Sequence, residues 1–147
     1  MSSRSVSDLQ PDVRRDCVLL MNKAAAEGMS VTLIDTLRSP AEQQVKIATG
    51  VSWTQNSLHE PQPPDGLARA FDLAPTELIV IKGWAPESPL WKQLGAWGKA
   101  LGLEWGGDWP YNPPHSKPDP SHFQLRHPAT TTLADADTVP VVPEQQV

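Results

Sequence analysis

The segment DPSHFQL, residues 119–125, places Asp119 three positions before His122. Only three other histidines occur in the sequence, and one of them, His59, precedes the segment AFDL with Asp72. Two imidazoles and one carboxylate, with water as a fourth ligand, form the open tetrahedral arrangement of catalytic zinc sites, and imidazole ligands favour zinc over magnesium or calcium. His59, Asp72 and His122 are therefore candidate zinc ligands. The alternative is a chance triplet, because any chain with several histidines and aspartates contains such combinations.

The elements that must position these residues begin with a helix in PDVRRDCVLLMNKAAAEG, residues 11–28, where proline suits the first turn and apolar residues recur at helical spacing. VTLIDTL, residues 31–37, predicts a short strand. A second helix is predicted in the following segment, RSPAEQQVKIATG, because Ser39 and Glu42 form a capping-box pattern. Arg38 thus lies at a junction between strand and helix, from which a side chain can point into a cleft.

The second half of the chain alternates turn-rich segments with predicted elements. EPQPPDG, residues 60–66, predicts an irregular loop, and LARAFDLAP after it predicts a strand. A third helix is predicted to begin at Ser88 and Pro89, and HFQL is predicted to be a last strand with His122 and Gln124 on one face. Helices and strands are interspersed but few, which favours an α+β fold over a doubly wound sheet.

Composition restricts the possible partners. The 147 residues suffice for one domain, which we expect to span residues 1–127, while the polar, aperiodic residues 128–147 predict a disordered tail. The net charge is −5 and the basic residues are scattered, so we expect no nucleic-acid or membrane-surface partner. Cys17, the only cysteine, is predicted to be a core residue and excludes an intramolecular disulfide. No signal peptide and no apolar run of ~18 residues is present, so we expect a chain made in the cytoplasm. We also expect a monomer.

Five segments occur in the order TLRSPAEQ, SLH, ARAFDL, LEWGGDW and DPSHFQL. This set resembles the zinc peptidases of the D-Ala-D-Ala carboxypeptidase and L-alanyl-D-glutamate endopeptidase family, which includes many phage endolysins. The resemblance covers roughly residues 8–126. It implies that His59, Asp72 and His122 bind zinc, that Asp119 is the catalytic base and that Arg38 contacts substrate. It also implies a small antiparallel sheet with flanking helices, of the Hedgehog and D,D-peptidase type.

One departure from the family pattern concerns the first two ligands. The pattern Ser-x-His-x6-Asp separates them by six residues, whereas twelve separate His59 from Asp72 here, and EPQPPD has the character of an insertion. A loop can absorb this extra length because closure entropy grows only logarithmically. His59 remains the candidate since no other histidine precedes Asp72.

The resemblance gives Asp119 and Arg38 roles beside the metal. Asp119 would take a proton from the attacking water and deliver it to the leaving amine, and Pro120 would limit the backbone between this base and His122. Arg38 would offer fixed donors to an oxyanion or a substrate carboxylate. The alternatives are that Asp119 only initiates a turn at Pro120 and Ser121, and that Arg38 belongs to a surface salt bridge.

Gln43 and His115 are further candidates for substrate binding. Gln43 fits the family spacing Arg-Ser-x-x-x-Gln, although a solvated glutamine on the first turns of a helix explains it equally well. His115 lies in a proline-rich loop and either lines the cleft or is an exposed loop residue. We interpret Ser39 as a helix cap and His127 as the edge of the fold.

Trp91 and Trp97 have helical spacing and are interpreted as core residues. Trp105 and Trp109 either form a wall of the cleft or serve packing alone. Between them, Asp108 is interpreted as a turn residue.

The expected function, from the resemblance, is a zinc metallopeptidase that hydrolyses an amide bond in the peptidoglycan stem peptide, as a phage L-alanyl-D-glutamate endopeptidase. It would be made in the host cytoplasm and act on the cell wall after release. One alternative is a D-Ala-D-Ala carboxypeptidase or dipeptidase. Another is a non-catalytic peptidoglycan-binding module of a phage particle, although a purely structural zinc site prefers four protein ligands and needs no base such as Asp119.

Overall fold

The computed structural model of the chain describes residues 3–39, 41, 44, 48, 58–62, 65–112 and 116–126. Gln43, His115 and the predicted tail 128–147 lie outside the described residues. Of the helix predicted after Ser39, the described residues are Ala41, Gln44 and Ala48, and all three are helical.

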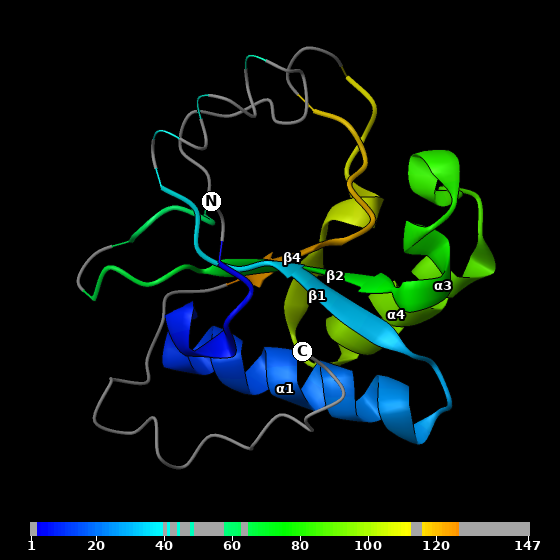
Figure 1. The fold of residues 1–147 in the computed structure, drawn as a ribbon, viewed down its shortest axis with the longest axis horizontal. Coiled ribbons are helices and arrows are strands. Elements are labelled where there is room, and N and C mark those ends of the chain that lie inside the picture. Colours follow the sequence, from blue (N-terminus) through cyan, green and yellow to red (C-terminus); the bar gives the residue numbers. More distant parts are fainter. Residues whose placement is uncertain are drawn as a thin grey trace.

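Four strands form one antiparallel sheet in the order β1-β2-β4-β3 (Figure 1). The strands are β1 (Val31–Asp35), β2 (Ala70–Pro75), β3 (Leu103–Trp105) and β4 (His122–Leu125). Residues in β1 alternate between buried and half-buried, as expected for a strand with one face on the core. The predicted α+β class and the predicted strands at residues 31–37, 67–75 and 122–125 are confirmed, whereas β3 was not predicted.

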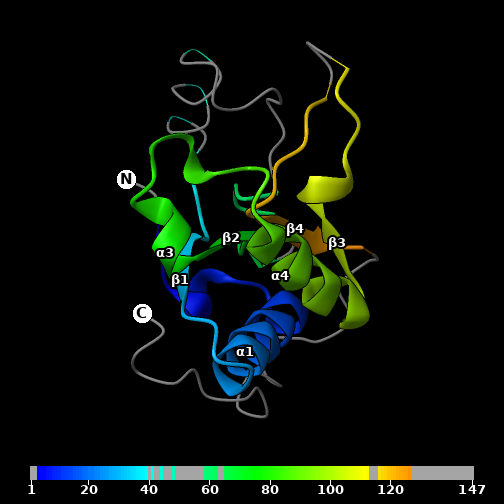
Figure 2. The same ribbon diagram turned by 90° about the vertical axis from the view of Figure 1, so that its right-hand side faces the viewer.

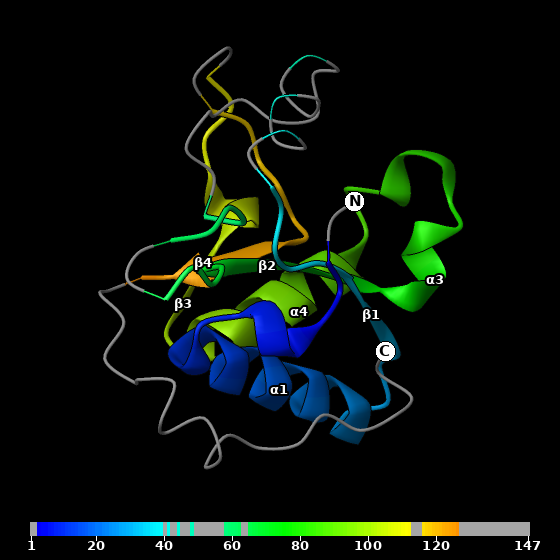
Figure 3. The same cartoon turned by 60° about the vertical axis from the view of Figure 1, so that its left-hand side comes forward.

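Two longer helices cover one face of this sheet, α1 (Pro11–Ala26) and α4 (Pro89–Ala100) (Figures 1 and 3). Each has proline in its first turn, and the Ser88 hydroxyl caps α4 by accepting from the Leu90 N–H at 3.3 Å. The shorter helices are α3 (Thr76–Ile79) and three 3₁₀ turns at Val6–Asp8, Lys82–Trp84 and Gly106–Asp108. None of the helices in the described part of the chain is long and apolar enough to cross a membrane.

The core lies between the sheet and the two long helices. Phe71 and Phe123, from neighbouring strands, stack with their ring centroids 5.4 Å apart. A Cβ at Gly98 of α4 would overlap the Phe123 ring, so glycine allows the helix to approach the sheet closely. Cys17 and Trp91 are buried, which confirms their predicted core positions. Trp97 is half-buried and packs against the same core.

The described parts of the connections that follow β1 and precede β4 lie on the opposite face of the sheet from α1 and α4 (Figure 2). That face carries the candidate site residues of β2 and β4. The core therefore fixes the sheet from one side and leaves the other side for the site.

Candidate metal centre

His59, Asp72 and His122 meet in the folded chain, with one ligand atom of each within 4.8 Å of the others. Asp72 and His122 are direct partners across β2 and β4. His59 comes from the turn before β2, and its ring centroid lies 5.2 Å from that of His122. The Asp72 Oδ1 atom lies 3.4 Å from His59 Nε2 and 3.6 Å from His122 Nδ1. The structure thus brings together all three residues that the sequence proposed as ligands, despite the long spacing between the first two.

Backbone contacts hold His59 in place. Its side chain is buried, and its Nδ1 lies 2.9 Å from the Thr36 carbonyl oxygen. Since a carbonyl only accepts, Nδ1 donates and Nε2 presents its lone pair on the side of Asp72. The Arg38 N–H donates to the His59 carbonyl at 2.6 Å. Residues just after β1 therefore set both the backbone and the tautomer of His59.

Gln124 performs the corresponding task for His122. The two residues share one face of β4, and His122 Nε2 lies 2.8 Å from Gln124 Oε1. With Nε2–H donating to this amide oxygen, Nδ1 presents its lone pair on the side of Asp72. A hydrogen bond from the non-ligating nitrogen is the usual way in which proteins orient metal-binding histidines.

Trp109 covers the other side of His122. Its ring centroid lies 4.8 Å from that of His122, and its indole N–H donates to Glu104 Oε2 at 2.9 Å. Glu104 pairs with Gln124 across β3 and β4, so the carboxylate and the amide that support His122 are neighbours in the sheet. Trp109 therefore lines the candidate site. Trp105 instead belongs to the core, and its indole N–H donates to the Pro120 carbonyl at 2.7 Å.

Charges in the group favour an ionised Asp72 beside its two imidazoles. Burial acts to raise the pKa of Asp72, but the charge of His59 and the contacts with His122 outweigh it and lower that pKa below its ordinary value. Burial likewise acts to lower the pKa of His122, yet Asp72 and the charge of Asp119 raise it above 6.5. The group therefore attracts positive charge.

The residues present fit a divalent metal ion. Asp72 Oδ1 is buried and accepts no hydrogen bond from a described residue. Two imidazole lone pairs converge on the same place as this oxygen. A buried carboxylate oxygen that accepts no hydrogen bond is costly unless a cation lies beside it. Three ligands of this kind leave one position of a tetrahedral zinc site open.

Asp119 lies beside the three candidate ligands without belonging to their group. Burial and the charge of Asp72 raise its pKa, and the imidazole of His122 partly offsets this. Its backbone opens a turn, because the His122 N–H donates to the Asp119 carbonyl at 3.1 Å. Asp119 therefore both opens a turn and lies beside the candidate ligands, whereas the sequence left the turn and a role at the metal as alternatives.

Gly106 provides the support for Asp119. The Asp119 N–H donates to the Gly106 carbonyl at 2.8 Å. A Cβ at position 106 would overlap the Asp119 carbonyl oxygen, so only glycine allows this approach. No function was assigned to Gly106 from the sequence.

Arg38 is buried, which makes the interpretation as a surface salt-bridge residue wrong. Its Nη2 donates to Asp35 Oδ2 at 2.6 Å, and both side chains are less than a tenth exposed. Asp35 is the partner of Asp72 across β1 and β2. The Arg38–Asp35 pair therefore adjoins the strand that carries a candidate ligand. Sequence reasoning missed Asp35, although its spacing of three residues from Arg38 was a usable signal.

Comparisons with known proteins found a matching family and a curated relative. Residues 54–125 match a family described as D-alanyl-D-alanine carboxypeptidase. The L-alanyl-D-glutamate peptidase of Listeria phage A118 is 27% identical over 108 residues, which are 74% of this chain and 36% of that protein. The chain therefore spans little more than a third of the length of this relative.

A solved structure shares the fold. The L-Ala D-Glu endopeptidase ChiX of Serratia marcescens superposes with a TM-score of 0.60 at 23% identity, over 85% of this chain and 88% of that one. The family match and the phage relative confirm the resemblance predicted from the five sequence segments. Residues 54–125 therefore match the D-alanyl-D-alanine carboxypeptidase family in sequence, and the chain shares its fold with a solved L-Ala D-Glu endopeptidase.

Proposed function

We propose that the protein is a zinc-dependent peptidase that hydrolyses the L-alanyl-D-glutamate bond of the peptidoglycan stem peptide. The observation that carries the proposal is the convergence of His59, Asp72 and His122 with Asp119 beside them. Two imidazoles and one carboxylate form one of the ligand sets of catalytic zinc sites, and an adjacent carboxylate that is not a ligand can serve as the general base. The substrate is proposed from the names of the relatives in a phage and in Serratia marcescens.

His59, Asp72 and His122 would hold the zinc ion, which supplies Lewis acidity that lowers the pKa of water. Asp119 accepts the proton of the attacking water and passes it to the leaving amine. The raised pKa of this carboxyl makes it a stronger base than an exposed aspartate, which suits the first step.

Arg38 stabilises negative charge on the substrate. The pairing with Asp35 fixes the direction of its guanidinium, which reduces the reorganisation needed when charge develops. Trp109 forms a wall beside His122 and restricts how the peptide enters. Gln43 and His115 remain predicted substrate-binding residues.

A second candidate is cleavage of a terminal D-Ala-D-Ala bond, which the description of the matching family favours. In that reaction Arg38 would bind the free terminal carboxylate. We further propose that the protein is a phage endolysin. It would act as a monomer on the bacterial cell wall after release from the host cytoplasm. The support is the phage relative.

The test is metal analysis of the purified protein, paired with mass spectrometry of digested peptidoglycan with and without a chelator. One zinc per chain and new chelator-sensitive amino termini at D-Glu support the proposal. Release of terminal D-Ala alone replaces the endopeptidase with the carboxypeptidase. Bound zinc with sedimentation on peptidoglycan but intact stem peptides favours the non-catalytic binding module instead.

A further inference from the structure

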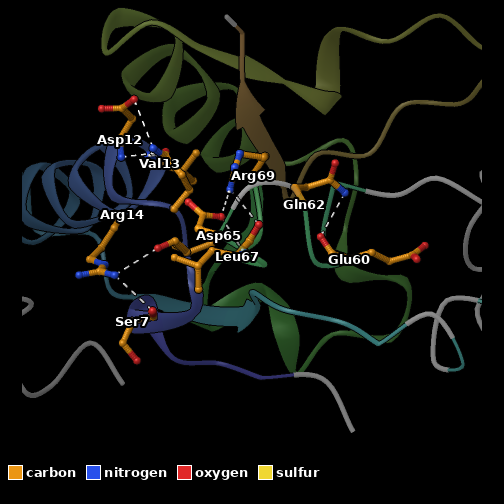
Figure 4. Close-up of polar contacts among 11 residues, drawn as sticks. Ser7, Asp12, Val13, Arg14, Glu60, Gln62, Asp65, Leu67 and Arg69 are labelled. Atoms are coloured by element: carbon orange, nitrogen blue, oxygen red, sulfur yellow. Dashed lines mark hydrogen bonds and ion pairs between the residues drawn. The ribbon is translucent and has the colours of Figure 1, made fainter. Parts of the chain in front are cut away.

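The segment that lengthens the spacing between His59 and Asp72 is organised by one carboxylate. Asp65 Oδ1 accepts from the Leu67 N–H and from Arg69 Nη1, both at 3.0 Å (Figure 4). Arg69 Nη1 also donates to the Leu67 carbonyl at 2.9 Å. The Asp65 and Arg69 side chains are only 13% and 10% exposed, so this ion pair is much less accessible than a typical surface pair.

Gln62 closes the same segment on itself. Its N–H donates to the Leu67 carbonyl at 3.2 Å, and its carbonyl accepts from the Gly66 N–H at 2.7 Å. The Gln62 side chain donates to the Glu60 carbonyl at 3.2 Å (Figure 4). The described residues of the segment therefore form a loop that is tied to Arg69 at its end.

The backbone of Arg69 joins the three segments that carry the candidate ligands. Its N–H donates to the carbonyl of Leu58, the residue before His59, at 2.8 Å. Its carbonyl accepts from the N–H of Leu125 in β4 at 3.0 Å, and β2 begins at the next residue. Any displacement of Arg69 is thus transmitted to the strands of Asp72 and His122 and to the turn of His59.

We propose that Asp65 and Arg69 are positioning residues for the metal centre, and that the described part of the loop, residues 60–62 and 65–66, aligns His59 with the two ligands of the sheet. The inference rests on the proposed function, because it concerns the same zinc site. The Asp65 carboxylate holds the Arg69 side chain against the loop, and the Arg69 backbone then holds Leu58. Removing one partner of a buried ion pair leaves the other charge uncompensated and destabilises the fold around it. Loss of Asp65 therefore releases the Arg69 side chain from the loop.

The experiment is a zinc competition titration with a chromophoric chelator on the full chain, comparing wild type with Asp65→Ala, Arg69→Ala and the double variant. Wild-type zinc binding shows first that the site of the proposed function exists. We expect each single variant to bind zinc about tenfold more weakly, the lower limit for loss of a residue that orients a ligand. The double variant should lose no more zinc affinity than either single variant, because the two side chains act as one unit.

Lys23→Ala and Glu27→Ala are matched controls. This ion pair has the same spacing of four residues, spans 3.2 Å and lies half-exposed at the C-terminal end of α1. Its loss should leave zinc affinity unchanged. Asp65→Asn retains an acceptor for the Leu67 N–H and should recover part of the affinity, and far-UV circular dichroism establishes that each variant is folded.

Two results overturn the inference while leaving the proposed function intact. One is a lower Tm of the metal-free variants with unchanged zinc affinity, which would make the pair a stability element only. The other is affinity losses that add in the double variant. Absence of zinc binding by the wild type would instead refute the proposed function.

Discussion

Asp72 on β2 and His122 on β4 are direct partners in the sheet, with the carboxylate oxygen 3.6 Å from Nδ1 of the ring. Antiparallel pairing places their side chains on the same face, so the sheet itself sets the separation of two candidate ligands. His59 joins them from a separate turn. The site therefore depends on long-range pairing. Substitutions can distinguish the residues that bind the metal from those that support them.

The first prediction distinguishes base from ligand. Asp119→Ala should retain zinc close to one ion per chain and lose about 10²–10⁴-fold in kcat, because general acid–base catalysis contributes an effect of this size. His122→Ala should lose both zinc and turnover. Metal analysis and a muropeptide assay on the same preparations provide the comparison, and equal loss of zinc in the two variants would make Asp119 a ligand.

The second prediction concerns Gly106. Gly106→Ala introduces a Cβ that overlaps the Asp119 carbonyl oxygen, so it should displace the base and lower kcat at least tenfold with zinc still bound. Gly28→Ala is the control, because its Cβ would meet no atom within 4 Å, although its φ of +84° makes alanine strained. The control should lose stability but not turnover, and the same loss of turnover in both variants would contradict the prediction.

The third prediction concerns Gln124. Gln124→Leu removes the acceptor for His122 Nε2 and should weaken zinc binding about 10–100-fold, as found for residues that orient metal ligands. Gln124→Glu keeps an acceptor at this position and should bind zinc more tightly than the leucine variant. The zinc competition titration measures both, and indistinguishable affinities would show that Gln124 does not orient the ring.

The fourth prediction is a pH dependence of stability in the metal-free protein. The pKa of His122 is raised in the folded state above its ordinary value of 6.5, so its favourable contribution is complete below pH 6.5 and is lost as pH rises through the folded-state pKa. Asp72 stays ionised in this range because its pKa is lowered. The Tm of the chelator-treated protein should therefore fall above pH 6.5.

His122→Gln is the control for this pH effect. Its Tm should change less between pH 6 and pH 9 than that of the wild type, because the titrating imidazole is absent. With zinc the dependence should reverse, since metal binding requires a neutral imidazole and competes with the proton. Thermal scans at several pH values, with zinc or with chelator, measure both effects, and a wild-type Tm that rises with pH in the chelator would refute the assignment.

The sequence alone determined the main elements and the candidate ligands. Helical periodicity and capping residues indicated α1 and α4. A short β-rich segment indicated β1, and alternation indicated β2 and β4. The spacing within DPSHFQL placed Asp119 near His122 because three residues cannot separate them far. These signals are local in the sequence, so they can be recognised without knowledge of the fold.

Only the tertiary structure decided how the site is supported. β3 has three residues and α3 has four, which is too short for periodicity to show, and β3 forms through its pairing with β4. Several contacts join residues whose proximity depends on the path of the chain. They are the buried Arg38–Asp35 pair, the contact of Trp109 with His122, and the connection from Asp65 through Arg69 to Leu58. Long-range pairing and packing determine such contacts, and no pattern within a single segment encodes them.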